Sequence, residues 1–308
     1  MEFRLRFPEI MERLCAPVGD PRPSPPVAVI AAHPDDEVIG AGGRLPRLKR
    51  CVLIQITDGA PVDMIDARKA GFQSREEYAR TRRRELMAAL SLADIKADQC
   101  LEIGLIDQEA SFHLVELTHQ LVRILADGKP EVVLTHPYEG GHPDHDAVAL
   151  AVQAACKILP GKGSRPPVLI EFTSYHARLP SSSGPVERSA HEKSRGGEYP
   201  TLPGDGEIIR GEFLPYHHQE VTEVFLSEEE RALKARMMNC FVTQKGILVH
   251  FPIGVERFRP APDYDFTRPP HPGLLYYGHF SWGMTGHCFR SLAAQALHEL
   301  GFRGSPCL

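Results

Sequence analysis

Two short polar clusters carry the residues best suited to chemistry in this 308-residue chain. The first, His33-Pro34-Asp35-Asp36-Glu37, places one imidazole beside three carboxylates. The second, Gly140-Gly141-His142-Pro143-Asp144-His145-Asp146, adds two imidazoles and two carboxylates. Imidazoles and carboxylates bind catalytic metal ions and transfer protons near neutral pH. The two clusters together predict a hydrolytic metal site.

The residues of these clusters can divide the tasks of such a site. A catalytic zinc ion typically has three protein ligands and one open position for water, and His33, Asp36 and His145 form such a set. Asp35 is then free to take a proton from the zinc-bound water and to return it to a leaving group. We expect His142 to stabilise an oxyanion, with Asp144 orienting the His142 ring.

Each cluster follows an apolar run that is typical of a strand buried on both faces. The runs are Val27–Ala32 and Val132–Thr135, and Cys51–Thr57 and Val168–Phe172 resemble them. Stretches of helical period separate the runs, which predicts an α/β fold with a mostly parallel sheet flanked by helices. Because parallel strands deliver their carboxyl ends to one edge, the two clusters should face each other there.

Several helices are expected from capping residues and apolar spacing. Ser74 with Glu77 forms a capping box before one helix, and Ser227 with Glu230 forms another. Apolar residues at helical spacing mark two more helices, over Leu114–Leu125 and over Val148–Leu159 just after Asp144.

The remaining chain predicts a domain organisation. Residues 1–26 should form a short amphipathic helix and a proline-rich linker, and residues 27–308 a single domain. The segment at about 180–206 is rich in Gly, Pro and Ser and reads as a loop insertion. The proline-rich stretch Phe251–Gly278 reads as extended chain, so we expect an irregular C-terminal part that closes over the strand ends.

Composition excludes several classes of protein. The formal net charge of −5 argues against nucleic acid as a partner. The apolar runs are far shorter than the roughly 20 residues of a membrane helix, so no span is expected. The N-terminus lacks the unbroken apolar stretch of a secretory signal, and the seven cysteines form no CxxC pair. These features predict a cytoplasmic protein with reduced thiols.

The His33–Glu37 and His142–His145 motifs resemble those of the PIG-L/LmbE-like family of metal-dependent N-acetyl-sugar deacetylases. The likeness extends through Ile56–Gly59 and Arg82–Glu85 and covers about residues 27 to 160. It is looser in the C-terminal part, at residues that include Gln244, Phe251, Glu256, Phe280, Trp282 and Gly283.

The resemblance implies a Rossmann-like sheet and hydrolysis of an acetamide on a glucosamine-type sugar. It implies Zn²⁺ held by His33, Asp36 and His145. Asp35 is implied as the general base, and His142 as the group that stabilises the oxyanion. Arg82 and Asp107 fall roughly where family members place groups that contact the sugar.

Other interpretations of the same residues remain open. Two histidines and one carboxylate also form the facial triad of non-haem Fe(II) oxygenases, and a sugar- or metal-binding module without activity is a third possibility. Fe(II), Co(II) or Mn(II) can occupy such a site instead of zinc. Asp144 can be an N-cap of the following helix. The sequence does not determine the number of subunits or which acetylated substrate is used.

A few aromatic and histidine residues have no assigned role. His217 and His218 are adjacent, so on a strand they would point to opposite faces and not serve one ion. His279 and the single tryptophan, Trp282, can line a sugar pocket, because a flat aromatic face suits a pyranose ring. A lone tryptophan is more often a packing residue, and we expect packing here.

Overall fold

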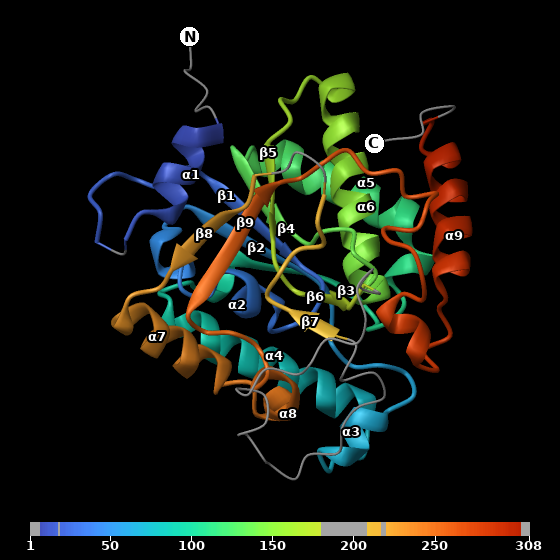
Figure 1. The fold of residues 1–308 in the computed structure, drawn as a ribbon, viewed down its shortest axis with the longest axis horizontal. Coiled ribbons are helices and arrows are strands. Elements are labelled where there is room, and N and C mark those ends of the chain that lie inside the picture. The colour runs from blue at the N-terminus through green and yellow to red at the C-terminus, as the bar shows by residue number, and fades with distance from the viewer. Residues whose placement is uncertain (1–6, 18, 180–207, 217–219, 303–308) are drawn as a thin grey trace.

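The computed structural model describes residues 7–17, 19–179, 208–216 and 220–302. Its centre is a seven-stranded sheet in the order β3-β2-β1-β4-β5-β9-β8 (Figure 1). The strands are β1 (Val27–Ala31), β2 (Cys51–Thr57), β3 (Cys100–Leu105), β4 (Val132–Thr135), β5 (Val168–Phe172), β8 (Thr222–Phe225) and β9 (Val255–Pro260). The first five in this order are parallel, whereas β9 pairs antiparallel with β5 and with β8. The predicted α/β fold with a mostly parallel sheet is confirmed.

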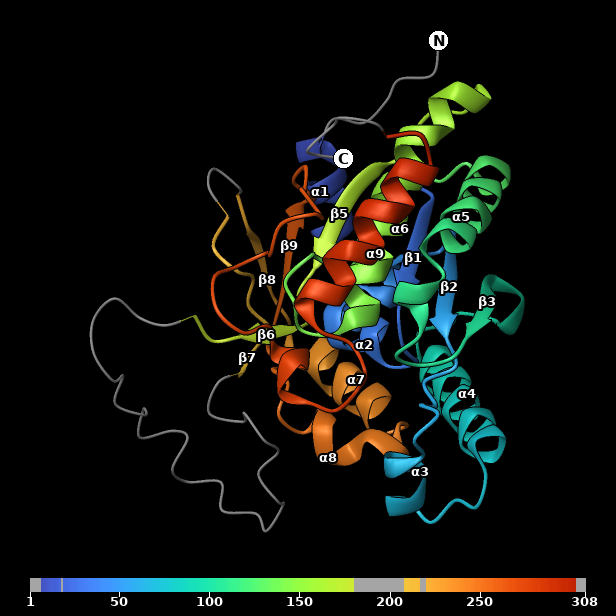
Figure 2. The same cartoon turned by 90° about the vertical axis from the view of Figure 1, so that its right-hand side faces the viewer.

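Helices cover both faces of the sheet, which explains the unbroken apolar runs of its central strands. In β1, Val27 and Val29 face one apolar cluster while Ala28 and Ile30 face the other. The first cluster lies under α1, α2, α4 and α7, and the second under α5, α6 and α9 (Figure 2). These helices are α1 (Phe7–Cys15), α2 (Asp36–Ala41), α4 (Arg75–Leu92), α5 (Leu114–Gly128), α6 (Pro143–Ile158), α7 (Glu228–Met238) and α9 (Gly286–Glu299).

The smaller elements lie at the ends of the sheet strands. β6 (Tyr175–Ala177) and β7 (Ile208–Arg210) form a separate antiparallel pair. α3 (Ile65–Lys69) and α8 (Lys245–Leu248) are short helices that lie near each other in both views (Figures 1 and 2).

The capping residues begin two helices where the sequence predicts them. The Ser74 side chain accepts a hydrogen bond from the backbone N–H of Glu77 at the start of α4. At α7, Ser227 and Glu230 make both hydrogen bonds of the capping box. Each such cap typically contributes about 1 kcal/mol to helix stability.

The C-terminal part is more regular than its proline content indicates. β9 lies inside the stretch expected to be extended chain, and it joins the central sheet through its pairs with β5 and β8. α9 packs on α5 and α6. Residues before β9 and residues between β9 and α9 lie at the ends of the parallel strands, where they line the pocket described below.

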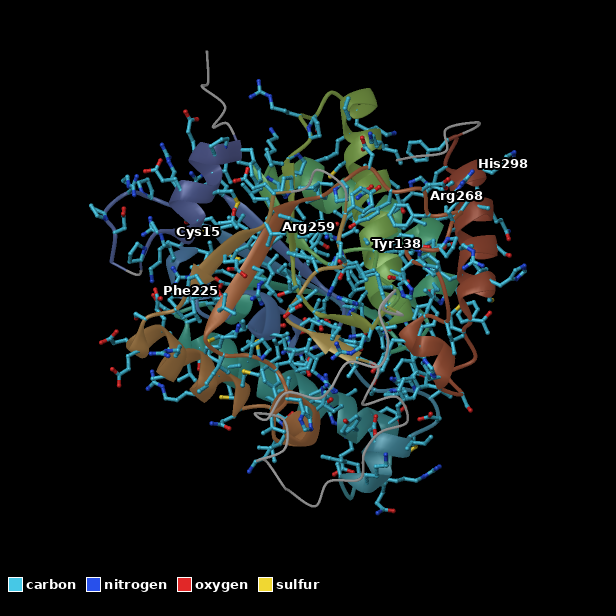
Figure 3. The ribbon with its side chains drawn as sticks, viewed as in Figure 1. Cys15, Tyr138, Phe225, Arg259, Arg268 and His298 are labelled. Atoms are coloured by element: carbon cyan, nitrogen blue, oxygen red, sulfur yellow. The ribbon has the colours of Figure 1, made fainter. Side chains whose placement is uncertain are left out.

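An interior arginine ties this C-terminal part to the parallel sheet. Arg259 of β9 is 1% exposed and lies in the interior (Figure 3). Its guanidinium donates to Glu171 of β5 at 2.7 Å and to Glu139, which follows β4, at 2.9 Å. A buried charge is tolerated only with such partners, so these contacts fix β9 beside the loop that carries the second polar cluster.

No helix among the described residues is long and apolar enough to cross a membrane. The six cysteines in the described ranges are free thiols, and Cys307 lies outside those ranges. The expected loop insertion at about 180–206 and the pair His217 and His218 also lie outside the described residues.

Candidate metal and catalytic site

The two polar clusters meet at the carboxyl ends of β1 and β4, which are neighbours in the sheet. β1 pairs with β2 on its other side, so the chain leaves β1 and β4 toward opposite halves of the sheet. Ligands of open parallel sheets bind at this kind of topological switch point. The expectation that the clusters face each other is therefore met by the strand order.

His33, Asp36 and His145 bring one donor atom each to a common point. His33 Nδ1 lies 3.1 Å from Asp36 Oδ2 and 3.2 Å from His145 Nε2. His145 Nε2 lies 3.2 Å from Asp36 Oδ2, which closes the triangle. All three residues are buried.

This triangle has the dimensions of one face of a zinc coordination tetrahedron. Bonds of about 2.0–2.1 Å at tetrahedral angles hold neighbouring ligand atoms about 3.3 Å apart. The observed separations of 3.1–3.2 Å are close to that value. The donor set therefore fits a small divalent cation.

Neighbouring groups orient the two imidazole rings so that His33 Nδ1 and His145 Nε2 point into the triangle. The other ring nitrogen of His33, Nε2, lies 3.1 Å from Asp107 Oδ1 and 3.1 Å from Asp144 Oδ2. The other ring nitrogen of His145, Nδ1, lies 3.4 Å from the hydroxyl of Ser174. Metal-binding histidines commonly have a carboxylate or another polar partner on the second nitrogen, and this contact fixes the ring orientation.

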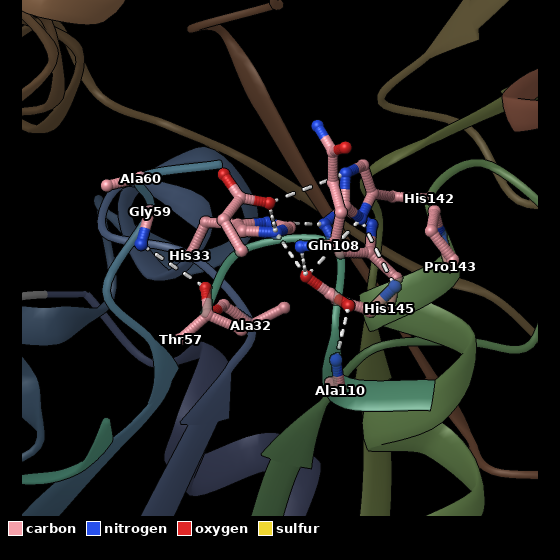
Figure 4. Close-up of polar contacts among 12 residues, drawn as sticks. Ala32, His33, Thr57, Gly59, Ala60, Gln108, Ala110, His142, Pro143 and His145 are labelled. Carbon is pink, nitrogen blue, oxygen red and sulfur yellow. Dashed lines mark hydrogen bonds and ion pairs between the residues drawn. The ribbon is translucent and has the colours of Figure 1, made fainter. Parts of the chain in front are cut away.

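The structure changes the role expected for Asp144. Its carboxylate accepts hydrogen bonds from the backbone N–H groups of Gln108, at 2.6 Å, and Ala110, at 3.0 Å (Figure 4). It therefore faces His33, whereas its distance to His142 Nδ1 is 3.9 Å. The N-cap of α6 is His142, and Asp144 lies in the first turn of the helix.

His142 is oriented by the backbone rather than by a carboxylate. Its Nδ1 accepts a hydrogen bond from the backbone N–H of Asp144 at 3.2 Å. Because that nitrogen is an acceptor, the proton of the neutral ring is on Nε2. Burial, with the nearby His33, lowers the His142 pKa to about 3, so the ring is neutral and presents one N–H donor.

Asp35 is held beside the triangle of His33, Asp36 and His145 by Arg82. The guanidinium of Arg82 donates to Asp35 Oδ2 at 3.2 Å and to the Pro34 carbonyl at 2.7 Å. Burial raises the pKa of Asp35 to about 7, against the opposing effect of Arg82. A cation bound nearby favours the charged carboxylate and would lower this pKa. Arg82 and Asp107, the two expected sugar contacts, both line the pocket. Arg82 contacts Asp35, and Asp107 contacts His33.

The backbone at Asp35 adopts an uncommon conformation, with φ at 136°. Positive φ is costly for residues with a Cβ, and asparagine and aspartate tolerate it better than other non-glycine residues. The Asp35 N–H donates to Glu37 Oε2 at 3.2 Å. The turn therefore aims the Asp35 carboxylate toward Arg82 at a backbone cost that its surroundings must offset.

The charges of the triangle favour cation binding. Burial alone would raise the Asp36 pKa, but the nearby imidazoles of His145 and His136 lower it well below its usual value. Burial lowers the pKa of His145 to about 3, so its ring is neutral, as a metal ligand must be. Burial disfavours a charged His33, but the carboxylates of Asp107, Asp144 and Asp36 outweigh this and raise its pKa. A metal ion bound by His33 would therefore have to displace a proton from its ring.

His136 is a residue at the site that the sequence analysis does not assign. It follows β4 directly, as His33 follows β1 closely, and its ring stacks on His145 with centroids 4.0 Å apart. Its Nε2 lies 3.4 Å from Asp36 Oδ2 but accepts the backbone N–H of Ala32 at 3.0 Å. Since that lone pair is already used, His136 is less suited to bind metal than His33 or His145.

The described residues contain other convergent donor sets around the same point. One combines His33, His142 and His145, another His33, Asp107, His142 and Asp144, and a third Asp36, His136 and His145. In the second set, both Asp144 oxygens and the Nδ1 atom of His142 accept backbone N–H groups. The triangle of His33, Asp36 and His145 leaves both imidazole lone pairs directed at the common point.

A pocket of about 120 Å³ opens over the triangle. Asp35, Asp107 and His142 line it beside the donor atoms, together with Arg82. The C-terminal half of the chain contributes further lining residues, namely Tyr175, Gln244, Ile247, Leu248, Phe251 and Trp282. The pocket joins the candidate metal ligands, the candidate base and these three aromatic side chains in one space.

Gly141 is required by the close approach of two backbones beside this site. A Cβ atom at Gly141 would overlap the carbonyl oxygen of Tyr175. We expect Gly141→Ala to lower the free energy of unfolding by about 1–3 kcal/mol, measured by urea denaturation, and to displace His142. Gly161→Ala is the control, because nothing lies within 4 Å of its added Cβ. Equal stability of the two variants would contradict this interpretation.

Both polar clusters lie in the part of the chain that is similar to known proteins. Residues 28–156 match the PIG-L family, described as GlcNAc-PI de-N-acetylase. A probable N-acetyl-alpha-D-glucosaminyl L-malate deacetylase 2 of Bacillus subtilis (strain 168) is 37% identical over 41% of this chain. The protein of the same name in Bacillus cereus is 32% identical over 46% of it. The chain spans 58% and 64% of the length of these two relatives.

Solved structures share the fold. The deacetylase Dbv21, which acts on an antimicrobial pseudoaglycone, aligns over 76% of this chain and 96% of its own, with a TM-score of 0.51 and 17% identity. The zinc-inhibited form of the teicoplanin deacetylase Orf2 aligns over 76% and 97%, with a TM-score of 0.50 and 14% identity. Both polar clusters thus lie within residues 28–156, the segment that matches the PIG-L family.

Proposed function

We propose that this protein is a metal-dependent hydrolase that removes the N-acetyl group from a glucosamine-type sugar or glycoside. The observation that carries the proposal is the triangle of His33 Nδ1, Asp36 Oδ2 and His145 Nε2 beside the Asp35 carboxylate. The deacetylase names of the family and of the two Bacillus relatives support the same reaction class.

His33, Asp36 and His145 would hold the cation, and zinc fits the donor set best. A bound divalent cation lowers the pKa of water and polarises a carbonyl oxygen. Asp35 takes the proton from the attacking water as the water oxygen bonds to the acetamide carbon, and then delivers that proton to the departing amine. The C–N bond breaks, which leaves acetate and the free amino sugar.

His142 stabilises the negative charge that develops on the acetamide oxygen. Its Nδ1 accepts the backbone N–H of Asp144, so its Nε2–H, 3.8 Å from Asp107 Oδ1, is the donor left for a substrate in the pocket that His142 lines. A preorganised donor of this kind typically contributes about 10²–10³ in kcat. The positive charge of Arg82 balances the Asp35 carboxylate, and the hydrogen bond between them keeps Asp35 in place. We propose that Arg82 and Asp107 also contact sugar hydroxyls.

The pocket has room for an acetamide, because its volume of about 120 Å³ exceeds the roughly 10–15 Å³ that one water molecule needs on this measure. With the acetamide beside His142, the sugar ring must lie toward the mouth of the pocket.

The test is acetate release from N-acetylglucosamine, its chito-oligomers and N-acetylglucosaminides. The zinc-loaded protein is expected to release one acetate per free amine formed, and protein treated with a chelator is expected to be inactive until zinc returns. The same release without oxygen separates hydrolysis from an Fe(II) oxygenase. Stoichiometric zinc binding without acetate release from any of these compounds would contradict the proposal.

A further inference from the structure

Part of the pocket wall comes from sequence outside the segment that matches the PIG-L family. The family match ends at residue 156, whereas Trp282 lines the pocket from the segment before α9. Trp282 is partly exposed, and it is the only tryptophan of the chain. No part of the proposed hydrolysis uses it.

We propose that the pyranose ring of the substrate packs against the indole of Trp282, so that Trp282 selects N-acetylated pyranosides over acyclic acetamides. The proposal rests on the proposed deacetylase function, because that function places the acetamide in the pocket. One residue of the C-terminal part thus supplies the apolar surface against which the sugar ring packs.

The position of the indole supports this contact. The Trp282 ring centroid lies 4.8 Å from that of His142, with the planes at 46°. In an N-acetylhexosamine the acetamide nitrogen is bonded directly to a ring carbon. A substrate whose carbonyl oxygen meets His142 must therefore place its ring within a few ångströms of the indole.

A neighbouring aromatic stack fixes the direction of the indole. Phe280 stacks on Trp282 with centroids 4.3 Å apart and planes at 8°, and Tyr276 packs edge-on against Phe280 at 5.1 Å. Tyr276 contacts Tyr175, which also lines the pocket, at 5.6 Å. The indole is therefore preorganised, which limits the ordering cost of binding.

The chemistry of a pyranose suits this surface. One face of a glucosamine-type ring presents C–H groups, while its hydroxyls project from the edge. An aromatic face covers such C–H groups, and the indole N–H can donate to a hydroxyl at the ring edge. Within the described residues this N–H has no hydrogen-bond partner.

The competing interpretation is that Trp282 only packs the core, since its ring also contacts the apolar cluster under α9. The two interpretations differ in what Trp282→Ala does to different substrates. Loss of packing lowers the melting temperature and affects all acetamides alike. Loss of a sugar contact raises KM for the pyranoside selectively.

Kinetics of Trp282→Ala and Trp282→Phe test the selectivity. For N-acetylglucosamine we expect KM to rise about tenfold in the alanine variant, with kcat changed less than about threefold. KM for N-acetylethanolamine, which has no ring, should change less than about twofold in the same protein. Trp282→Phe should recover most of the loss. Equal changes for both substrates would overturn the proposal and indicate packing.

Intrinsic fluorescence supplies a readout that does not depend on turnover. Because Trp282 is the only tryptophan, its emission reports this position alone. Zinc-loaded Asp35→Asn protein titrated with N-acetylglucosamine should show a saturable change in emission, and N-acetylethanolamine should leave the emission unchanged. Sugar binding detected by calorimetry without any emission change would overturn the Trp282 contact while leaving the deacetylase proposal intact. Absence of acetate release by wild type, tested separately, identifies failure of the proposed function.

Discussion

Asp35→Asn is expected to lower kcat for acetate release by about 10²–10⁴-fold while the protein retains its zinc. The substitution removes the carboxylate that is proposed to take the proton of the attacking water. Asparagine is the suitable replacement, because it tolerates the positive φ of this position better than alanine does. Acetate release and zinc content, measured on the same preparations, provide the comparison.

The matched control for this substitution is Asp98→Asn, which makes the same chemical change at an exposed position outside the pocket. It should retain the activity and zinc content of wild type. If Asp35→Asn binds zinc and keeps more than about one tenth of the wild-type kcat, Asp35 is not the general base.

His145→Ala is expected to bind zinc at least about 100-fold more weakly than wild type. The binding free energy of a structural zinc site is about 10–16 kcal/mol, which is about 3 kcal/mol for each of its four ligands. The loss of one ligand therefore corresponds to an affinity about 100-fold lower or more. Activity at limiting zinc should fall in parallel. Zinc titration against a competing chelator measures the affinity directly.

His119→Ala is the control for this loss, because His119 is an exposed histidine on α5. Its zinc affinity should equal that of wild type. Full zinc affinity in His145→Ala would mean that the ion binds one of the other donor sets, such as that of His33, Asp107, His142 and Asp144.

The central part of the fold could be predicted from sequence because its signals are local and strong. Strands buried on both faces produce continuous apolar runs, as in Val27–Ala31, and a serine cap fixes the start of α4 at Ser74. β9 was not predicted, since Arg257 and Arg259 interrupt its apolar pattern. The charge of Arg259 is balanced by the carboxylates of Glu139 and Glu171, which are far away in sequence.

The edge strand β3 was missed for a related reason. It is covered less completely than the central strands, and Leu101 and Glu102 are both exposed. An edge strand of this kind has neither an unbroken apolar run nor strict alternation. Gly104, with φ at +81°, further weakens the strand signal.

The convergence of His33, Asp36 and His145 follows from sequence once their two strands are neighbours. The contacts that hold these ligands in place do not follow from sequence. Asp144 lies near His142 in the chain, yet the backbone turn at residues 108–110 captures its carboxylate and directs it to His33. Likewise, Trp282 reaches the pocket through tertiary packing that no local pattern predicts.

The proposed metal site is tested most directly by the position of the metal in crystals of the zinc-loaded protein, located by anomalous scattering at the zinc edge. We predict one strong peak about 2.0–2.2 Å from His33 Nδ1, Asp36 Oδ2 and His145 Nε2. The Asp35 carboxylate should lie beside the peak without binding it. A peak bound by His142 and Asp107 instead, or no peak in protein that releases acetate, would contradict the assignment of His33, Asp36 and His145 as the metal ligands.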